Sequence, residues 1–126
     1  MTAKELNIKL LSFLPELEDE YSSCVSSFDG DDTGSHIVFS CVLVPYIIKS
    51  ANERDVLKLQ KSLDFIEMVL SYNDLYSQEV VAFSVLENLI FSDELNVDIY
   101  AHLRDRTKKV YGEVNELWEE MSGEKH

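Results

Sequence analysis

Apolar residues recur at spacings of three and four along most of this chain, which is the periodicity of helices that bury one face. The clearest example is the amphipathic set Val56, Leu59, Leu63, Ile66 and Leu70. No run alternates apolar and polar residues for long enough to indicate a strand, and glycine and proline are scarce. The pattern therefore predicts an all-α protein.

About six to seven helices are expected from this periodicity and from residues that begin and end helices. Their approximate ranges are 4–14, 15–28, 35–50, 53–70, 75–91, a short helix ending at His102, and a last helix opening at Asp105. The expected caps of the third, fourth and sixth helices are Ser35, Asn52 and either Ser92 or Asp93. Pro45 lies inside the third helix and is expected to kink or divide it, because proline removes a hydrogen bond there.

The length of 126 residues is that of one domain, so residues 1–126 are expected to form a single compact bundle. Short connections favour antiparallel neighbours. Residues 52–91 form an expected helix pair whose second member, 78–89, resembles the inner helix of HEAT-like repeats. The rest of the chain does not repeat this unit clearly, which favours one HEAT-like hairpin at the centre of the bundle over a solenoid.

Negative charge is concentrated in one folded stretch. The chain has a net charge of −13, and residues 62–103 contain no Lys or Arg. Its carboxylates are Asp64, Glu67, Asp74, Glu79, Glu87, Asp93, Glu94 and Asp98. Uncompensated charge opposes compaction and is tolerated for solubility or for a partner. Both interpretations, a solvated face and a binding face, stay open at this point.

Composition also narrows the class of partner and the compartment. Phosphate backbones and anionic membranes need clustered Lys and Arg, so basic proteins are the expected counterpart. No apolar stretch approaches the roughly 20 residues that span a bilayer, and the N-terminus lacks the pattern of a secretion signal. Cys24 and Cys41 lie among apolar neighbours and are expected to be reduced core residues. We therefore expect a cytoplasmic protein that binds neither nucleic acid nor membranes.

No set of residues predicts a reaction. The loop 29–34 resembles the start of a calcium loop, but Ser40 occupies the twelfth position, where a bidentate Glu is needed. His36 and His102 lack a partner at metal-ligand spacing. His36 is expected to have a structural role, with Asp31 or Asp32 as a possible partner. Catalysis by Cys24 with His36 or His102 as its base would need electropositive surroundings, whereas the surroundings are acidic and apolar. We predict no enzyme activity, no metal and no cofactor.

Three segments carry a resemblance to a class of known proteins. They are Leu14-Pro15-Glu16-Leu17 with Glu20-Tyr21, Ser35-His36-Ile-Val-Phe39 leading to Val44-Pro45-Tyr46, and Gln78-Glu79-Val80-Val81 with Val85-Leu86-Glu87. The chain is similar in these segments to small bacterial all-α proteins, several families of which are immunity proteins of polymorphic or contact-dependent-inhibition toxins. The resemblance implies a stoichiometric inhibitor that covers the active site of one cognate toxin, often a basic nuclease. It implies no catalytic residues.

Partner contacts are expected in the acidic stretch, with two tyrosines as anchors because Tyr is favoured at binding hot spots. The predicted partner-binding residues are Asp64, Glu67, Tyr72, Asp74, Tyr76, Glu79, Glu87, Asp93 and Glu94. A second acidic set, Glu16, Asp19, Asp29, Asp31 and Asp32, is the alternative surface. The competing functional hypothesis is a HEAT-like adaptor or structural homo-oligomer with an apolar interface, in which the acidity serves only solubility.

Overall fold

A computed structural model describes residues 1–122 and confirms the all-α prediction. Six continuous helices form this part of the chain, with no strand among the described residues. The helical segments are α1 (Ala3–Phe13), α2 (Glu18–Ser26, preceded by a 3₁₀ turn Pro15–Leu17), α3 (Ser35–Val38), α4 (Val44–Asn52), α5 (Val56–Leu70), α6 (Leu75–Glu79), α7 (Glu87–Ile90) and α8 (Asp105–Ser122). Segments α3 and α4 belong to one helix, and α6 and α7 to another. Short 3₁₀ turns also lie at Gly30–Asp32 and Ile99–His102.

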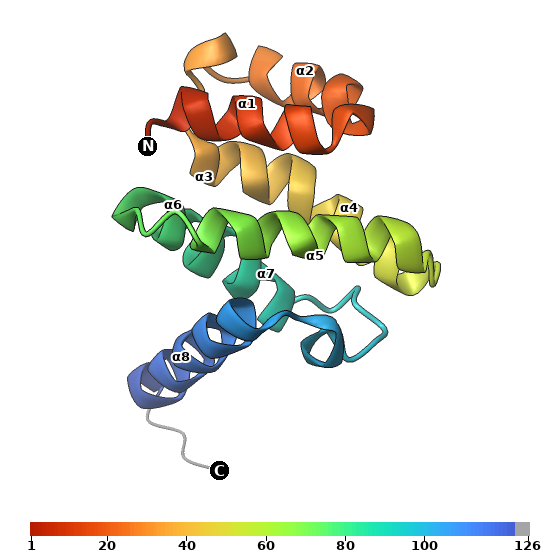
Figure 1. Cartoon of the computed structure of the whole chain (residues 1–126), viewed down its shortest axis with the longest axis vertical. Coiled ribbons are helices and arrows are strands. Elements are labelled where there is room, and N and C mark those ends of the chain that lie inside the picture. The colour runs from red at the N-terminus through yellow and green to blue at the C-terminus, as the bar shows by residue number, and fades with distance from the viewer. Residues whose placement is uncertain (123–126) are drawn as a thin grey trace.

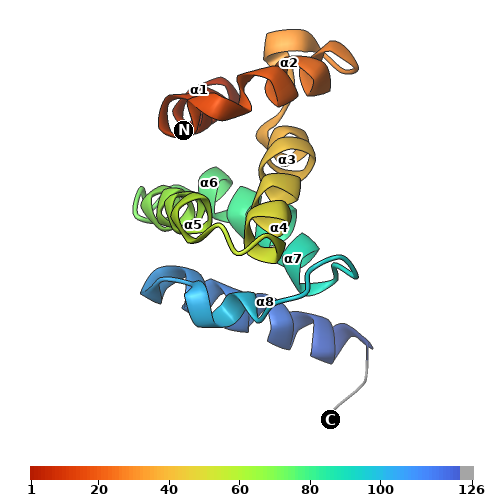
Figure 2. The same cartoon turned by 90° about the vertical axis from the view of Figure 1, so that its right-hand side faces the viewer.

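The helices lie in three tiers along the longest axis of the molecule (Figures 1 and 2). Helices α1 and α2 form one end, the helices from α3 to α7 form the middle, and α8 lies across the other end. Within the middle tier, the α3–α4 helix packs against the α6–α7 helix, and α5 lies beside both. Helices α5 and α6–α7 follow each other and are in contact, as expected for a helix pair in 52–91.

One hydrophobic cluster connects the tiers. Leu6 and Leu10 of α1, Phe39 of the α3–α4 helix, Phe65 of α5 and Val85 of the α6–α7 helix are all fully buried in it. Phe65 contacts Phe39, with ring centroids 5.9 Å apart, and Phe13 at 5.5 Å. Burial of such side chains is worth roughly 1.5–3 kcal/mol each, so this cluster is the main stabilising term.

Both central helices contain a wider, π-helical segment. In the α3–α4 helix it covers Phe39–Leu43, where the Val44 N–H donates to the carbonyl of Phe39, five residues earlier. Pro45 follows directly and has no N–H, and its ring would collide with a carbonyl of the preceding turn in a regular α-helix. The helix was expected to be disrupted at Pro45, and it accommodates this proline by widening into the π segment. The second π segment, Val80–Leu86, packs against the first.

All three expected helix caps are wrong, and tertiary contacts explain the differences. Asn52 is the last residue of α4, and Asp55 caps α5 by accepting from the Lys58 N–H at 3.2 Å. The side chain of Asn52 instead holds the loop after α7. Its amide donates to the Glu94 carbonyl at 2.6 Å, and its oxygen accepts from the Asn96 N–H at 2.8 Å.

The loop that Asn52 holds is also where the expected sixth helix fails. Neither Ser92 nor Asp93 caps a helix, and only Ile99–His102 forms a 3₁₀ turn, capped by Asp98. The Glu94 carbonyl and the Asn96 N–H are both hydrogen-bonded to the side chain of Asn52. These groups are therefore not available for a helical ladder.

Ser35 is likewise the first residue of α3 and not its cap, which is Gly34. The Ser35 side chain is buried and lies 2.8 Å from Asn7 Oδ1 and 3.1 Å from the Ala3 carbonyl, so it joins α3 to α1. His36 also differs from expectation. Its Nδ1 contacts the Ser84 hydroxyl, and its ring lies edge-on to Tyr76, so it bridges the two central helices and contacts neither Asp31 nor Asp32 among the described hydrogen bonds.

The end of α4 carries backbone strain that a substitution can measure. Arg54 has φ of 56°, and the N–H groups of Arg54 and Asp55 donate to the carbonyls of Ala51 and Ser50. This is the helix-ending motif in which glycine is favoured at the left-handed position. We expect Arg54→Gly to be more stable than Arg54→Ala by about 1 kcal/mol in urea unfolding. Both variants lose the same charge, so equal stabilities would show that the position is unstrained.

Candidate protein-binding surface

The α5 carboxylates of the predicted surface are occupied within the chain. Asp64 Oδ1 lies 2.8 Å from Arg104 Nε, and this hydrogen bond lowers the pKa of Asp64. Glu67 accepts from the backbone N–H groups of Arg106 and Thr107 at 3.2 and 3.0 Å, and from the Thr107 hydroxyl at 2.9 Å. Because the first N–H groups of a helix lack partners, Glu67 acts as the cap of α8. Asp64 and Glu67 therefore fix the last helix to α5.

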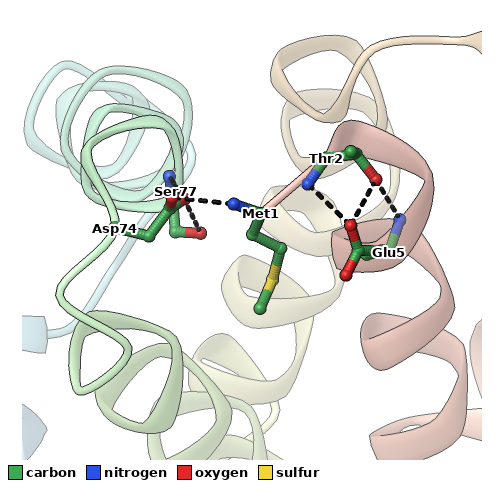
Figure 3. Close-up of polar contacts among 5 residues, drawn as sticks. All are labelled: Met1, Thr2, Glu5, Asp74 and Ser77. Carbon is green, nitrogen blue, oxygen red and sulfur yellow. Dashed lines mark hydrogen bonds and ion pairs between the residues drawn. The ribbon is translucent and has the colours of Figure 1, made fainter.

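Asp74 is also held by contacts within the chain (Figure 3). Its Oδ1 lies 2.8 Å from the α-amino group of Met1, while Oδ2 accepts from the N–H and hydroxyl of Ser77 at 2.9 and 2.8 Å. The hydrogen bond with the Met1 ammonium and those with Ser77 lower the pKa of Asp74 to about 2. Beside it, Thr2 and Glu5 form a reciprocal capping box at the start of α1.

The two predicted anchor tyrosines are half-buried at helix junctions. The ring of Tyr72 lies under Lys9 Nζ, 5.3 Å from the ring centroid, and so contacts α1. The Tyr76 hydroxyl accepts from the Ser35 N–H at 3.1 Å and joins α6 to α3. Each ring has a structural partner, which limits the area left for a second protein.

The remaining predicted residues lie on two separate surfaces. Glu79 lines a groove of about 550 Å³ between α6 and α8, together with Leu75, Phe83 and Lys109. Asp93 and Glu94 line a different groove, of about 410 Å³, with Phe91 and Asn88. Glu87 is half-buried and lines neither of these two grooves. The structure thus does not bring the predicted residues into one surface.

A third region is a groove that is lined in part by acidic side chains. Two adjoining grooves of about 350 and 440 Å³ run between α2 and the residues 41–53 and share Glu20 and Cys41. We call them together the α2 groove. It is lined by Glu16, Leu17, Asp19, Glu20, Ser23, Cys24, Ser27, Phe28, Cys41, Val42, Pro45, Tyr46, Lys49, Ser50, Glu53 and Lys58.

The two ends of the α2 groove differ in charge. At one end the Tyr46 hydroxyl donates to Glu16 Oε2 at 2.7 Å, which lowers the pKa of Glu16, and Lys49 and Lys58 lie nearby. At the other end the wall carries Asp19 and Glu20, with no Lys or Arg among the residues that line it. Both carboxylates are exposed at the first turn of α2, where the helix dipole favours negative charge.

An exposed aromatic residue completes the acidic end. Phe28 follows α2 and is 53% exposed, although it is a large apolar side chain. Aromatic side chains are frequent anchors of binding interfaces, and neighbouring carboxylates orient a basic partner through charge complementarity. We therefore take Asp19, Glu20 and Phe28 as the centre of the candidate surface.

The alternative acidic set that the sequence predicts includes only part of this surface. Glu16 and Asp19 belong to that second acidic set, whereas Glu20, Phe28 and Tyr46 were missed. The available signal was a second stretch without Lys or Arg, from Leu10 to Ile48. It contains Glu16, Glu18, Asp19, Glu20, Asp29, Asp31 and Asp32. The other members of that set, Asp29, Asp31 and Asp32, are exposed around the 3₁₀ turn after α2 and do not line the groove.

These features define a small, acidic, all-α protein with an exposed groove and no cluster of metal-ligating residues among residues 1–122. The chain belongs to the family described as Domain of unknown function (DUF7674), whose model matches residues 8–119 and so includes the whole α2 groove. Neither the curated proteins nor the solved structures contain a significant match. Within residues 1–122, no helix has the length and apolar character needed to cross a membrane.

The capping role of Glu67 predicts a stability effect. We expect Glu67→Ala to lower the free energy of unfolding by about 1–2 kcal/mol, because two backbone N–H groups and one hydroxyl of α8 lose their acceptor. Glu79→Ala is the matched control on an exposed carboxylate, with an expected change within about 0.5 kcal/mol. Urea unfolding of both variants makes the comparison, and equal losses would contradict the capping role.

The lowered pKa of Asp74 predicts a dependence on pH. A carboxylate with a folded pKa of about 2 and an unfolded pKa near 3.8 stabilises the fold above the higher value. That stabilisation is lost as the pH falls through about 2. Asp74→Asn should therefore be destabilised at neutral pH, and its stability should fall less steeply than that of the wild type below about pH 4. Thermal unfolding from pH 7 to 2 measures the difference, and parallel curves would be the contrary result.

Proposed function

We propose that this protein is a stoichiometric binding protein for a basic protein partner, which it engages through the α2 groove. The observation that carries the proposal is the coincidence of a groove, exposed carboxylates and an exposed aromatic ring at Asp19, Glu20 and Phe28. In the acidic stretch 62–103, Asp64, Glu67 and Asp74 are held within the chain. The groove beside Asp93 and Glu94 has a similar composition, but its exposed ring, Phe91, already packs against Trp118 with ring centroids 5.1 Å apart.

Charge supports the choice of partner. The net charge of −13 gives the whole molecule a negative potential, which accelerates the encounter with a positively charged surface. At the Phe28 end of the α2 groove no Lys or Arg is among the lining residues, and Asp19 and Glu20 provide acceptors for Lys and Arg side chains of a partner. An anionic ligand would be repelled there. Glu20 also lines the adjoining end, which carries Lys49 and Lys58.

The specific form of the proposal is an immunity-type inhibitor that acts in the cytoplasm and has no enzymatic activity of its own. A nuclease toxin binds substrate phosphates with Lys and Arg, and carboxylates of an inhibitor can occupy the same positions. The support is the acidity and the groove, together with the sequence resemblance to bacterial immunity proteins.

The test uses the C-terminal domain of the protein encoded by the adjacent upstream gene as the probe. Co-expression with this chain should relieve the growth arrest that the domain causes, and the purified proteins should form a 1:1 complex. The double variant Asp19→Lys with Glu20→Lys should lower the association rate by at least tenfold at low salt, since each close charge pair contributes on the order of 1 kcal/mol or more. The wild-type rate should fall steeply as salt is raised.

Two variants with the same charge change serve as controls. Asp93→Lys with Glu94→Lys reverses charge on the surface that the sequence favoured, and Glu116→Lys with Glu120→Lys does so on exposed positions of α8. Both should bind nearly as the wild type does, with a small general loss of steering. Equal loss in all three variants would show that only net charge matters. Loss confined to Asp93 and Glu94 would move the interface to that surface. Absence of any complex would contradict the immunity-type form.

A second candidate function, a structural homo-oligomer, has one observation in its favour. The groove between α6 and α8 exposes Leu75 by 71% and Phe83 by 44%, and it carries Arg106 and Lys109 beside Glu79 and Glu113. Such a mixed surface could pair with a copy of itself. Light scattering over a range of protein concentrations distinguishes the two: the inhibitor form predicts a monomer, whereas a dimer that Leu75→Lys disrupts would support the oligomer.

A further inference from the structure

The two cysteines of the chain lie together in the tertiary structure. Cys24 is on α2 and Cys41 is in the π-helical segment of the neighbouring helix, and both line the Phe28 end of the α2 groove. Helix α2 packs against this π-helical segment, which brings the two cysteines to the same groove. The chain has only these two cysteines, and they come from different helices, so nothing in the local sequence forces this pairing.

The two thiols differ in their access to solvent. Cys24 is only 5% exposed, as expected for a core residue, but Cys41 is exposed to solvent, so the prediction that both are core residues is wrong for Cys41. Burial, together with the neighbouring Cys41 thiol, raises the pKa of Cys24 to about 11, so Cys24 stays a protonated thiol at neutral pH. A reagent from solvent therefore meets Cys41 first, and Cys24 lies behind it as a second thiol within the fold.

We propose that Cys41 and Cys24 are a redox-active pair, in which a small neutral peroxide oxidises Cys41 and Cys24 resolves the product to an intramolecular disulfide. The acidic wall of the groove favours a neutral oxidant, because Asp19 and Glu20 line the same end and repel anionic ones such as oxidised glutathione. This inference concerns the thiols alone and holds whether or not the α2 groove binds a protein.

The reaction balances with hydrogen peroxide as the only co-reactant. The Cys41 thiolate attacks one peroxide oxygen, the O–O bond breaks, and the hydroxide that leaves becomes water, giving a sulfenic acid at Cys41. The Cys24 sulfur then attacks the Cys41 sulfur, the S–S bond forms and the S–O bond breaks. The departing hydroxide takes the Cys24 proton and leaves as a second water. Two thiols are oxidised and one peroxide is reduced.

The disulfide would link α2 covalently to the central tier. Residues 24 and 41 enclose the loop that contains the 3₁₀ turn and the start of α3, so the link removes conformational freedom from the unfolded chain. On this basis the oxidised protein should melt roughly 5–15 °C higher than the reduced one. Cys41 also lies in a π segment, where the helix is already wider than a regular α-helix and can adjust to the bond.

The experiment treats the full chain with hydrogen peroxide under native conditions, blocks remaining thiols, and reads the product by intact mass and peptide mapping. Trypsin would leave both cysteines in one peptide, because no Lys or Arg separates them, so a protease that cleaves after Asp and Glu is needed. Asp29, Asp31 and Asp32 provide sites between the two cysteines. The expected product is a monomer that has lost two hydrogens, contains a Cys24–Cys41 cross-link, and is restored by dithiothreitol.

Controls separate the effect of the fold from ordinary thiol chemistry. In guanidinium chloride the same cross-link should form at least severalfold more slowly, because the helices no longer hold the thiols together. Cys41→Ser changes only an exposed side chain and should leave Cys24 reduced under native conditions. The proposal is overturned if native Cys41 proceeds to a sulfinic acid while Cys24 stays free. A product consisting only of dimers linked through Cys41 would overturn it equally.

Discussion

The contact between the two central helices is the constraint on which the rest of the structure depends. The α3–α4 and α6–α7 helices meet at their π segments, Phe39–Leu43 and Val80–Leu86. The carbonyl of Ser84 accepts from the Asn88 side chain at 2.8 Å and lies 3.2 Å from the Ser40 hydroxyl. Polar side chains thus satisfy the backbone where the helices are irregular, and helices α1, α2, α5 and α8 all pack against this pair.

Several carboxylates of the stretch 62–103 stabilise this framework through contacts within the chain. Glu67 caps α8 from α5, and Asp74 caps α6 while it contacts the Met1 ammonium. A carboxylate placed at a helix N-terminus satisfies backbone donors and favours the helix dipole, so its negative charge is structurally useful. Such contacts within the chain account for four of the eight carboxylates of this stretch, Asp64, Glu67, Asp74 and Asp98. We therefore place the proposed binding surface at α2, where Asp19 and Glu20 line a groove and do not cap another helix.

The helices were largely predictable because their signals are local. The apolar positions of 56–70, the turn near Asn73 and the end of the fifth helix near Ile90 agree with the structure. The failures came where long-range bonds replace local ones: the Asn52 amide holds Glu94 and Asn96 in a loop, although Ser92 and Asp93 suggested a helix. Glu16 and Asp19 of the candidate surface belong to the alternative acidic set that the sequence predicts. The sequence does not predict that they line one groove with Phe28 and Cys41.

The sequence by itself determined the helical class, the position of most helices and the excess of negative charge, since periodicity and composition are properties of neighbouring residues. Only the tertiary structure decided which carboxylates remain exposed. Asp64 and Glu67 are engaged by residues near the start of α8, about forty positions away, whereas Asp19 and Glu20 stay open to solvent. It also decided that Cys24 and Cys41, from different helices, line the same groove. Such pairings follow from helix packing, which the spacing of residues along one helix does not specify.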